Sequence, residues 1–505
     1  MAYSSSALSF MLEDLGKTVI LTGAQIPMSQ LRNDAVDNLM GALTIAGHYI
    51  IPECCLYFNH TLYRGNRVSK MSSYDLSAFG SPNFSPLVNV GIDIVVNWNE
   101  VIRQTTIRRF RAHKSTYHES NKDHSDNPTE MSPHVATLRL FPGIATATIK
   151  AFFMPPIRGV VLETFGAGNA PQRADLMEAL KEACNRGVVV VAITQCAKGS
   201  VSDAYETGRT LLQAGVVSGN DMTPECALTK LSYLLSKPEL SVEEIRELIS
   251  TPLRGELTRP IRSAPSHPAT VEKTVEHIEG VLSEFVRLTS TPPRGPQITV
   301  TPEPETQLET SARDATAPWT LTVAEAANTE AVLIPFLIHL AAARDDLPGL
   351  QFSLAALEGA GKMEQNQSTN VAGGVVNCLD PATGKTPLHS ACVNGSARAA
   401  ILLLRSGALV HLRDSLGHTA LYYAARQGHE EVVDLLVQAG ATLGGFDEPF
   451  AALGLRDAVL AGNKIATKVW LKTGIKSSDD IISTRKTLQQ PPRKEGEERV
   501  IILDE

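Results

Sequence analysis

The chain has 505 residues, of which 43% are hydrophobic and 20% charged, as in globular proteins of two to four domains of about 150 residues. Its net charge of −8 argues against a nucleic-acid partner. It contains no apolar run of the ~18 residues that a membrane span needs, and its N-terminus lacks a signal-peptide layout. Seven scattered cysteines without CxxC spacing predict reduced thiols and a cytoplasmic location.

The first hundred residues alternate between helix and strand patterns. Residues 4–15 predict a helix, residues 18–21 a short strand, residues 33–46 a second helix and Cys54–Phe58 a buried strand. In the first helix we expect an apolar face made by Ala7, Leu8, Phe10, Met11 and Leu15. The alternation favours an α/β fold with a parallel sheet.

A polar, glycine-containing segment follows the buried strand, where α/β proteins place their chemistry. It carries three cations, Arg64, Arg67 and Lys70, opposed only by Asp75. A lysine held near a hydroxyl and a carboxylate can relay protons in acyl transfer, so Lys70 is a candidate catalytic residue. The alternative is a solvated loop with surface cations.

Residues 103–134 open with several arginines and continue with histidines. They are consistent with an anion-binding strip, a metal cluster or a surface loop. The histidine spacing fits no compact zinc motif, and Asp, Asn, Ser and Pro crowd residues 120–133, so we favour a surface loop.

Helix and strand patterns alternate again as far as residue 250. Residues 146–153, 174–186 and 204–214 predict helices, whereas residues 159–162 and 188–193 predict buried strands, the last of them central in a sheet. The glycines of residues 166–168 match a dinucleotide loop only weakly, and we prefer a tight turn. Cys196 is expected to be a buried structural cysteine, and Thr223 and Ser241 are expected to cap helices.

Several motifs in this part of the chain resemble those of the cytosolic (type I) L-asparaginases. The resemblance covers residues 2–258. It implies that Lys70 belongs to a catalytic constellation and that Asn169 contacts substrate from an adjoining subunit. It also implies a homo-oligomer that hydrolyses L-asparagine without metal or organic cofactor. The motifs are Thr22-Gly-Ala-Gln-Ile-Pro27, Arg64-Gly-Asn-Arg67, Ala78-Phe-Gly-Ser-Pro-Asn83, Phe141-Pro-Gly-Ile144, Glu163-Thr-Phe-Gly-Ala-Gly-Asn-Ala-Pro-Gln172, Thr194-Gln-Cys196 and Leu253-Arg-Gly-Glu-Leu257.

The resemblance also implies groups that the sequence does not show. In the family a nucleophilic threonine and a threonine–aspartate pair accompany the lysine, and we find neither of their segments here. We therefore expect an N-terminally truncated asparaginase with an incomplete first sheet that exposes an edge, and we expect it to be inactive. Thr22 is conceivable as a replacement nucleophile, but a turn residue is the preferred interpretation.

A 33-residue repeat follows a segment rich in Pro, Thr, Ser and Glu. Gly384-Lys-Thr-Pro-Leu-His389 recurs as Gly417-His-Thr-Ala-Leu-Tyr422, a period and pattern typical of ankyrin repeats. Because a stack needs about three repeats, we expect a diverged repeat at 448–474 and a degenerate one at 336–357. His389 and His418 are interpreted as loop-stabilising.

The sequence thus predicts an asparaginase-like α/β fold followed by an all-α ankyrin solenoid. Its regions are an incomplete doubly wound domain (1–135), a smaller α/β domain (136–258), a linker with one helix at 271–288 (259–320), the repeats (321–476) and a disordered tail (477–505). The main hypothesis is an asparaginase-type amidohydrolase. The alternatives are a silent scaffold that binds a protein through its ankyrin repeats, a lysophospholipase-type esterase and a nucleotide-binding enzyme.

Overall fold

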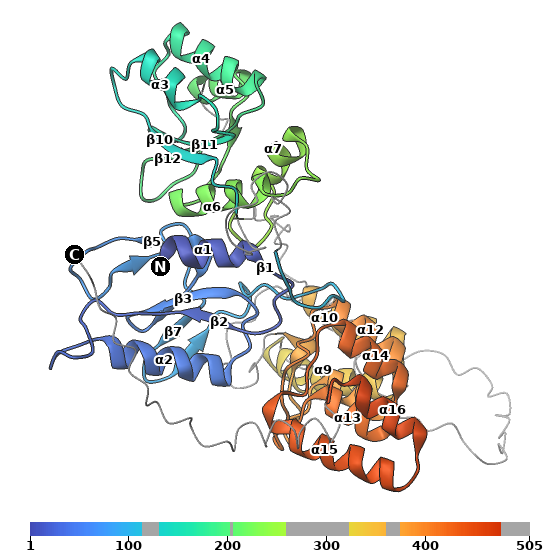
Figure 1. Cartoon of the computed structure of the whole chain (residues 1–505). Helices are drawn as coiled ribbons and strands as arrows, with labels where there is room; N and C mark the ends of the chain where they lie inside the picture. The colour runs from blue at the N-terminus through green and yellow to red at the C-terminus, as the bar shows by residue number, and fades with distance from the viewer. Residues whose placement is uncertain (114–130, 202–205, 259–322, 360–373, 476–505) are drawn as a thin grey trace, which may run out of the picture.

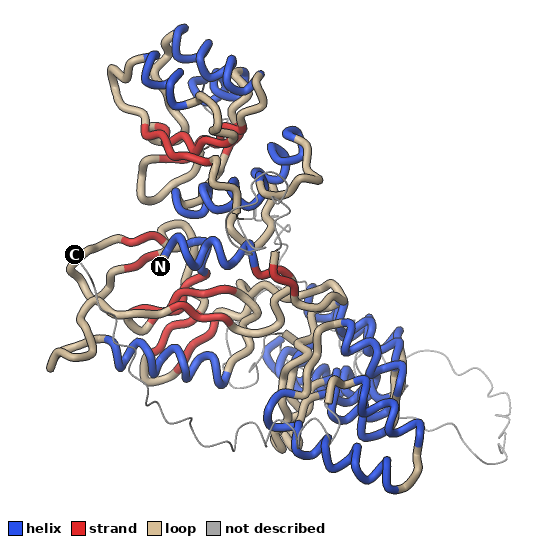
Figure 2. Tube along the Cα trace, in the orientation of Figure 1, coloured by secondary structure: helices blue, strands red, loops and turns tan. Residues whose placement is uncertain are grey.

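The computed structural model describes residues 1–113, 131–201, 206–258, 323–359 and 374–475. They form a first lobe (1–102), a connecting segment (103–113), a second lobe (131–258) and a helical stack (323–475), as Figure 1 shows. The strands lie in the two lobes and, as β9, in the connecting segment, and the stack is built of helices and loops (Figure 2). The predicted linker, its helix and the predicted tail lie outside the described residues.

A mixed five-stranded sheet forms the centre of the first lobe. Its β2–β3 pair is parallel and its other pairs are antiparallel, so the predicted parallel sheet is wrong for this lobe. Asn59 and His60 explain the difference: both have positive φ, 45° and 63°, and form a two-residue turn that folds β4 back onto β3. The strand order is β2 (Val19–Leu21), β3 (Cys54–Phe58), β4 (Thr61–Arg64), β7 (Val88–Val90) and β8 (Ile94–Val96).

Among the described residues, β2 and β8 are the two edge strands of this sheet. In the described part of the chain β2 pairs with β3 alone, and its three side chains are only partly buried. The prediction of β3 is confirmed in every residue, and all five of its side chains are buried. α2 (Ala35–His48) packs against β2 and β3, and its Gly41 lies so close to Tyr57 that a Cβ there would be 2.1 Å from the tyrosine oxygen.

The first helix, α1 (Ala2–Met11), buries a different face from the one predicted. Three serines and Phe10 are buried, whereas Leu8 and Met11 are only partly buried. Ser5 donates to Gly65 O at 2.8 Å, and small side chains of this kind allow close packing against η1 (Gly65–Arg67) and α6 (Pro224–Leu235). The predicted end of the helix is also wrong, because Leu12–Glu13 forms β1, which pairs with β9 (Arg111–Ala112).

The second lobe is a parallel α/β unit, as predicted. Its four strands pair in the order β10-β11-β12-β13, and β12 is internal with every side chain buried, which confirms its predicted central place. Alternate strand residues face two separate apolar clusters, one with α3, α4 and α5 and the other with α6 and α7. The elements are β10 (Val135–Arg139), α3 (Thr146–Phe152), β11 (Gly159–Thr164), α4 (Ala174–Asn185), β12 (Val189–Thr194), α5 (Glu206–Gln213), β13 (Val217–Ser218), α6 and α7 (Val242–Ser250).

Two helix starts in this lobe confirm their predicted caps. The Thr223 side chain accepts a hydrogen bond from Cys226 N at the start of α6, and Ser241 forms a capping box with Glu244 at the start of α7. Cys196, by contrast, is exposed, so its predicted burial is wrong. It follows β12 by two residues and so lies on the loop that leaves the sheet.

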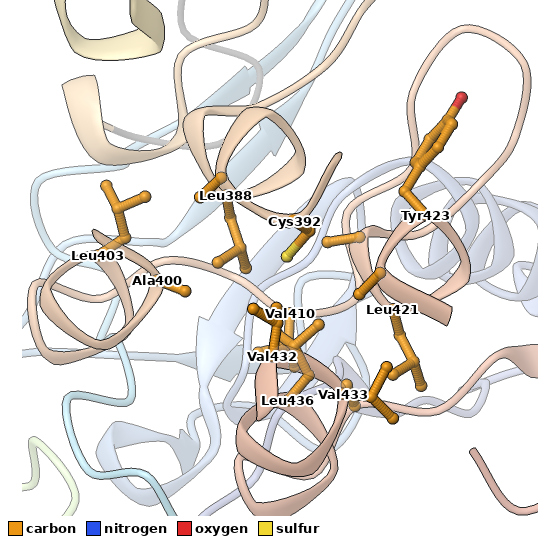
Figure 3. Close-up of a cluster of buried hydrophobic side chains, with 14 of the residues drawn as sticks. Leu388, Cys392, Ala400, Leu403, Val410, Leu421, Tyr423, Val432, Val433 and Leu436 are labelled. Carbon is orange, nitrogen blue, oxygen red and sulfur yellow. The ribbon is translucent and has the colours of Figure 1, made fainter. Parts of the chain in front are cut away.

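The helical stack contains four helix pairs around one apolar core, part of which is drawn in Figure 3. The predicted degenerate first and diverged last repeats correspond to its first and last pairs. His389 and His418 stabilise loops, as predicted: His389 Nε2 lies 3.1 Å from His418 O, and His418 Nδ1 lies 2.8 Å from Asp447 Oδ1. The elements are α9 (Val323–Ala343), α10 (Leu347–Gly359), η2 (Val375–Asn377), α11 (Pro387–Asn394), α12 (Ala397–Arg405), α13 (Ala420–Gln427), α14 (Glu430–Gln438), α15 (Gly444–Leu460) and α16 (Lys464–Lys472).

Within the described residues, no helix has the length and apolar character needed to cross a bilayer. No group of three or more His, Cys, Asp or Glu in that same part of the chain could hold a metal ion. His113, from the predicted histidine-containing loop, is buried and lies 2.8 Å from Ser236 Oγ.

Candidate active site

Lys70 is an exposed residue of a two-stranded ribbon in the first lobe. β5 (Ser69–Lys70) pairs with β6 (Phe79–Gly80), which places the ammonium group 5.7 Å from the centre of the Phe79 ring. Its Nζ donates to Gln25 Oε1 at 3.4 Å, and no ion pair among the described residues joins it to a carboxylate. In this arrangement Lys70 has an amide partner instead of the hydroxyl and carboxylate that a proton relay requires.

The neighbouring Ser69 faces the second lobe instead. Its hydroxyl donates to Glu225 Oε2 at 2.8 Å, from the first turn of α6. The pKa of Tyr3 on α1 is raised by partial burial and by the negative charges of Glu225 and Glu163. Glu163 is also 3.5 Å from Arg139. Two carboxylates, Glu225 and Glu163, therefore lie near Tyr3 at the junction of the two lobes, and Glu225 contacts Ser69, the neighbour of Lys70.

The sequence did not predict this junction. The predicted helix start at Thr223 is correct and places Glu225 in the first turn of α6, but it gives no signal of a contact with Ser69. The two residues are 156 positions apart, and only the packing of α6 against α1 and η1 brings them together.

Thr22 is held as a turn residue. Its hydroxyl donates to Tyr57 O at 3.0 Å, so it ties the end of β2 to β3. Gln25, in the same turn, connects the turn to the Lys70 ribbon, because its Nε2 also donates to Asp75 O at 3.1 Å. The hydroxyl of Thr22 is thus engaged with a backbone carbonyl, as expected for the preferred interpretation.

Asn169 lies in a tight turn at the carboxyl end of β11. Phe165 and Asn169 exchange two backbone hydrogen bonds of 2.8 Å, and Gly166 and Gly168 adopt positive φ of 46° and 114°. This geometry agrees with the predicted turn. Asn169 is half-buried, and the structure does not test its predicted contact with an adjoining subunit.

Arg64 and Arg67 are not part of a solvated loop. Both are buried, and both bind the segment 253–258 of the second lobe. Arg64 forms an ion pair with Glu53 at 2.6 Å and donates to Gly255 O at 3.1 Å. Arg67 donates to Glu256 O at 2.6 Å. Two of the motifs singled out in the sequence therefore recognise one another and hold the lobes together.

A buried ion pair extends this junction into α6. Lys230 Nζ lies 2.5 Å from Glu256 Oε1, with both side chains fully buried. The other donors of Lys230 reach Ile249 O at 2.9 Å and Thr251 O at 2.6 Å. Because each charge has a partner, the pair stabilises the segment 253–258, to which Arg64 and Arg67 bind.

Comparison with protein families agrees with this architecture. Residues 1–102 match the model described as "Asparaginase, N-terminal", residues 134–249 match "Glutaminase/Asparaginase C-terminal domain" and residues 338–447 match "Ankyrin repeats (3 copies)". L-asparaginase 1 of Escherichia coli (strain K12) is 44% identical over 259 residues, which are 51% of this chain and 72% of that protein. The chain belongs to the L-asparaginase family.

Two other relatives of this chain extend well beyond the region that matches it. The 60 kDa lysophospholipase of Homo sapiens is 46% identical over 260 residues, which cover 52% of this chain and 43% of that protein. The L-asparaginase of Dirofilaria immitis is 33% identical over 444 residues, which cover 88% of this chain and 63% of that protein. The chain thus spans about half to two thirds of the length of these relatives.

Proposed function

We propose that the chain is an asparaginase-type amidohydrolase module with Lys70 as its proton-relay residue and L-asparagine as its substrate. The membership of both lobes in the L-asparaginase family supports this assignment. Amide hydrolysis by a hydroxyl group needs that nucleophile, a base for its proton and donors for the oxyanion. Lys70 would take the proton of such a hydroxyl as it attacks the side-chain amide and would pass a proton to the nitrogen, which leaves as ammonia when the C–N bond breaks. Water would then release aspartate from the acylated residue.

We further propose that these 505 residues alone do not hydrolyse L-asparagine at a measurable rate. The observation that carries this proposal is the surroundings of Lys70. Its polar partner is the Gln25 amide, while the hydroxyls of Ser69 and Thr22 are bonded to Glu225 and to Tyr57 O. Loss of the nucleophile of a catalytic constellation typically lowers the rate by several orders of magnitude.

Ammonia release from L-asparagine tests both proposals. We expect the wild-type chain to release no more ammonia than its Lys70→Ala variant. Release that scales with protein and disappears in Lys70→Ala would contradict the inactivity proposal while supporting the role of Lys70. If Thr22→Ala also abolished that release, Thr22 would be the nucleophile. Release that persisted in Lys70→Ala would contradict the assignment of Lys70.

An esterase of the lysophospholipase type is the second candidate, because two of the relatives carry that name. The same three proteins incubated with lysophosphatidylcholine would reveal it as fatty acid release. Fatty acid without ammonia would favour the esterase over the amidohydrolase.

We also propose the remaining features that the resemblance implies. These are a cytoplasmic protein, a homo-oligomer with Asn169 facing an adjoining subunit, and protein contacts made by the ankyrin stack. The predicted domain division at residues 135, 258, 320 and 476 belongs to the same proposal. Light scattering of the purified chain measures the oligomer, and a mass of 54.4 kDa, that of one chain, would contradict it.

A further inference from the structure

The connecting segment, residues 103–113, lies against the ankyrin stack. This basic segment was expected to be part of a surface loop, but Ile107 packs against the apolar core of the stack. Arg109 Nε donates to Val437 O at 2.7 Å. Figure 1 shows this part of the chain between the first lobe and helices α10 and α12.

The segment packs against three equivalent positions in successive repeats. Gly374, Gly407 and Gly440 are spaced by 33 residues, the repeat period, and have positive φ of 78°, 89° and 86°. A Cβ would lie 2.7 Å from Arg103 Nη1 at Gly374, 3.0 Å from Arg103 Cβ at Gly407 and 3.4 Å from Arg109 Cα at Gly440. Glycine at these positions leaves space that the segment occupies.

The charge of Arg109 complements the C-terminal end of α14, which the segment contacts. Gly407 and Gly440 follow directly after α12 and α14, where the last carbonyls of a helix lack intrahelical donors and carry partial negative charge. Val437 O, which accepts from Arg109, is one of these carbonyls. Burial lowers the pKa of Arg103, as expected for a guanidinium removed from water. Arg109 therefore donates to the C-terminus of α14, whereas the aliphatic part of Arg103 packs beside Gly407 after α12.

The same segment is also bound to both lobes. Its β9 pairs with β1 at the end of α1, and Thr106 donates to Asp14 Oδ1 at 3.2 Å. His113 N donates to Met11 O at 2.7 Å, and the His113 ring lies 2.8 Å from Ser236 Oγ in the second lobe. Residues 103–113 are thus a junction at which the first lobe, the second lobe and the stack meet.

We propose that the edge of the ankyrin stack formed by Gly374, Gly407 and Gly440 is a recognition surface for residues 103–110 of the same chain. The stack then acts as a brace that binds the junction of the two lobes. This role is independent of whether the chain hydrolyses an amide. An outside protein that binds the stack must use its other faces or displace the segment.

Cleavage of the folded chain tests the proposal. A specific protease site is introduced within residues 289–296 of the full chain, the purified protein is cut, and the two halves are applied to a sizing column. We expect the wild-type halves to elute together. We expect Ile107→Asp to separate them, because a carboxylate replaces the apolar contact with the core of the stack. Separation of the wild-type halves, or co-elution of the Ile107→Asp halves, would overturn the proposal.

Two further variants test whether the separation is specific to the contact between the segment and the stack. Ile92→Asp places the same carboxylate at a fully exposed isoleucine of the first lobe, and its halves are expected to stay together. If they separated as the Ile107→Asp halves do, the effect would not be specific and the proposal would fail. Arg109→Ala removes an exposed side chain and its bond to Val437 O, so the protein should stay folded. We expect association of its halves to weaken by about fivefold, and unchanged affinity would contradict the assigned contact.

Discussion

Replacing Arg67 with alanine removes a buried guanidinium from the junction of the two lobes. The side chain is 2% exposed, lies 3.0 Å from Asp221 Oδ2 and donates to Glu256 O at 2.6 Å. Truncation leaves a largely buried carboxylate without its cation, which typically costs about 3–5 kcal/mol. Asp221 keeps a hydrogen bond of 3.1 Å from Thr258 N and a second from the Thr258 hydroxyl. We therefore expect the lower end of the range, about 3 kcal/mol.

Urea unfolding followed by far-UV circular dichroism and by tryptophan fluorescence measures this loss. With a slope of about 3 kcal/mol per M for lobes of this size, the transition of the lobes should move to lower urea by about 1 M. Arg139→Ala is the matched control. It removes an arginine whose side chain is 66% exposed and 3.5 Å from Glu163, so its cost should be below about 0.5 kcal/mol. If the Arg67 variant shifted no further than this control, Arg67 would not hold the lobes together.

Three further outcomes are expected. Thr223→Ala, which removes the cap that accepts from Cys226 N, should lower the stability of the second lobe by about 1 kcal/mol in the same titration, whereas Thr223→Ser should retain it. Burial lowers the pKa of His389 to about 4, so the neutral ring stabilises the stack fully above pH 6.5, and about 3 kcal/mol is lost as the pH falls from 6.5 to 4. Thermal melts at 222 nm, recorded between pH 6.5 and 4, should show this loss as a falling Tm. The Tm of His389→Gln should fall less over the same range, and an equal fall in both proteins would refute the role of His389. Lys70→Ala should leave the urea midpoint unchanged, because the side chain is exposed; a clear shift would show a structural role.

Much of the second lobe and of the stack could be predicted because the local signals agree there with the tertiary structure. The apolar run that forms β12 is buried on both faces of a parallel sheet, and Thr223 and Ser241 cap helices by contacts within three residues. The 33-residue repeat is sufficient to predict the helical stack, because each helix pair packs on its neighbours.

The first lobe was harder to predict because its decisive contacts are small or polar. Hydrophobic periodicity cannot indicate that α1 buries serines, since close approach of helices selects small side chains. The strand β4 ends in Arg64, whose charge suggests a loop until Glu53 is found beside it. The turn formed by Asn59 and His60 was the available signal for the antiparallel hairpin, and it was missed.

The candidate site shows the same limit. The place of Lys70 after a buried strand and the family resemblance singled it out, but neither could show that its amine meets the Gln25 amide or that Ser69 reaches Glu225 across the lobes. The Arg64-Gly-Asn-Arg67 and Leu253-Arg-Gly-Glu-Leu257 motifs were both found in the sequence, yet nothing local indicates that they bind one another. Such pairs, about 190 residues apart, become visible only in the folded chain.

The outermost strand of the first sheet, β2, has consequences for handling the protein. No described strand pairs with its outer edge, so the amide and carbonyl groups there can template a strand from another molecule, and Val19, Ile20 and Leu21 carry no charge that would repel one. Concentrated samples should therefore be prone to self-association by pairing of β2 edges from two molecules. An Ile20→Lys substitution would place a charge on this edge and should reduce such self-association in samples for the measurements described above.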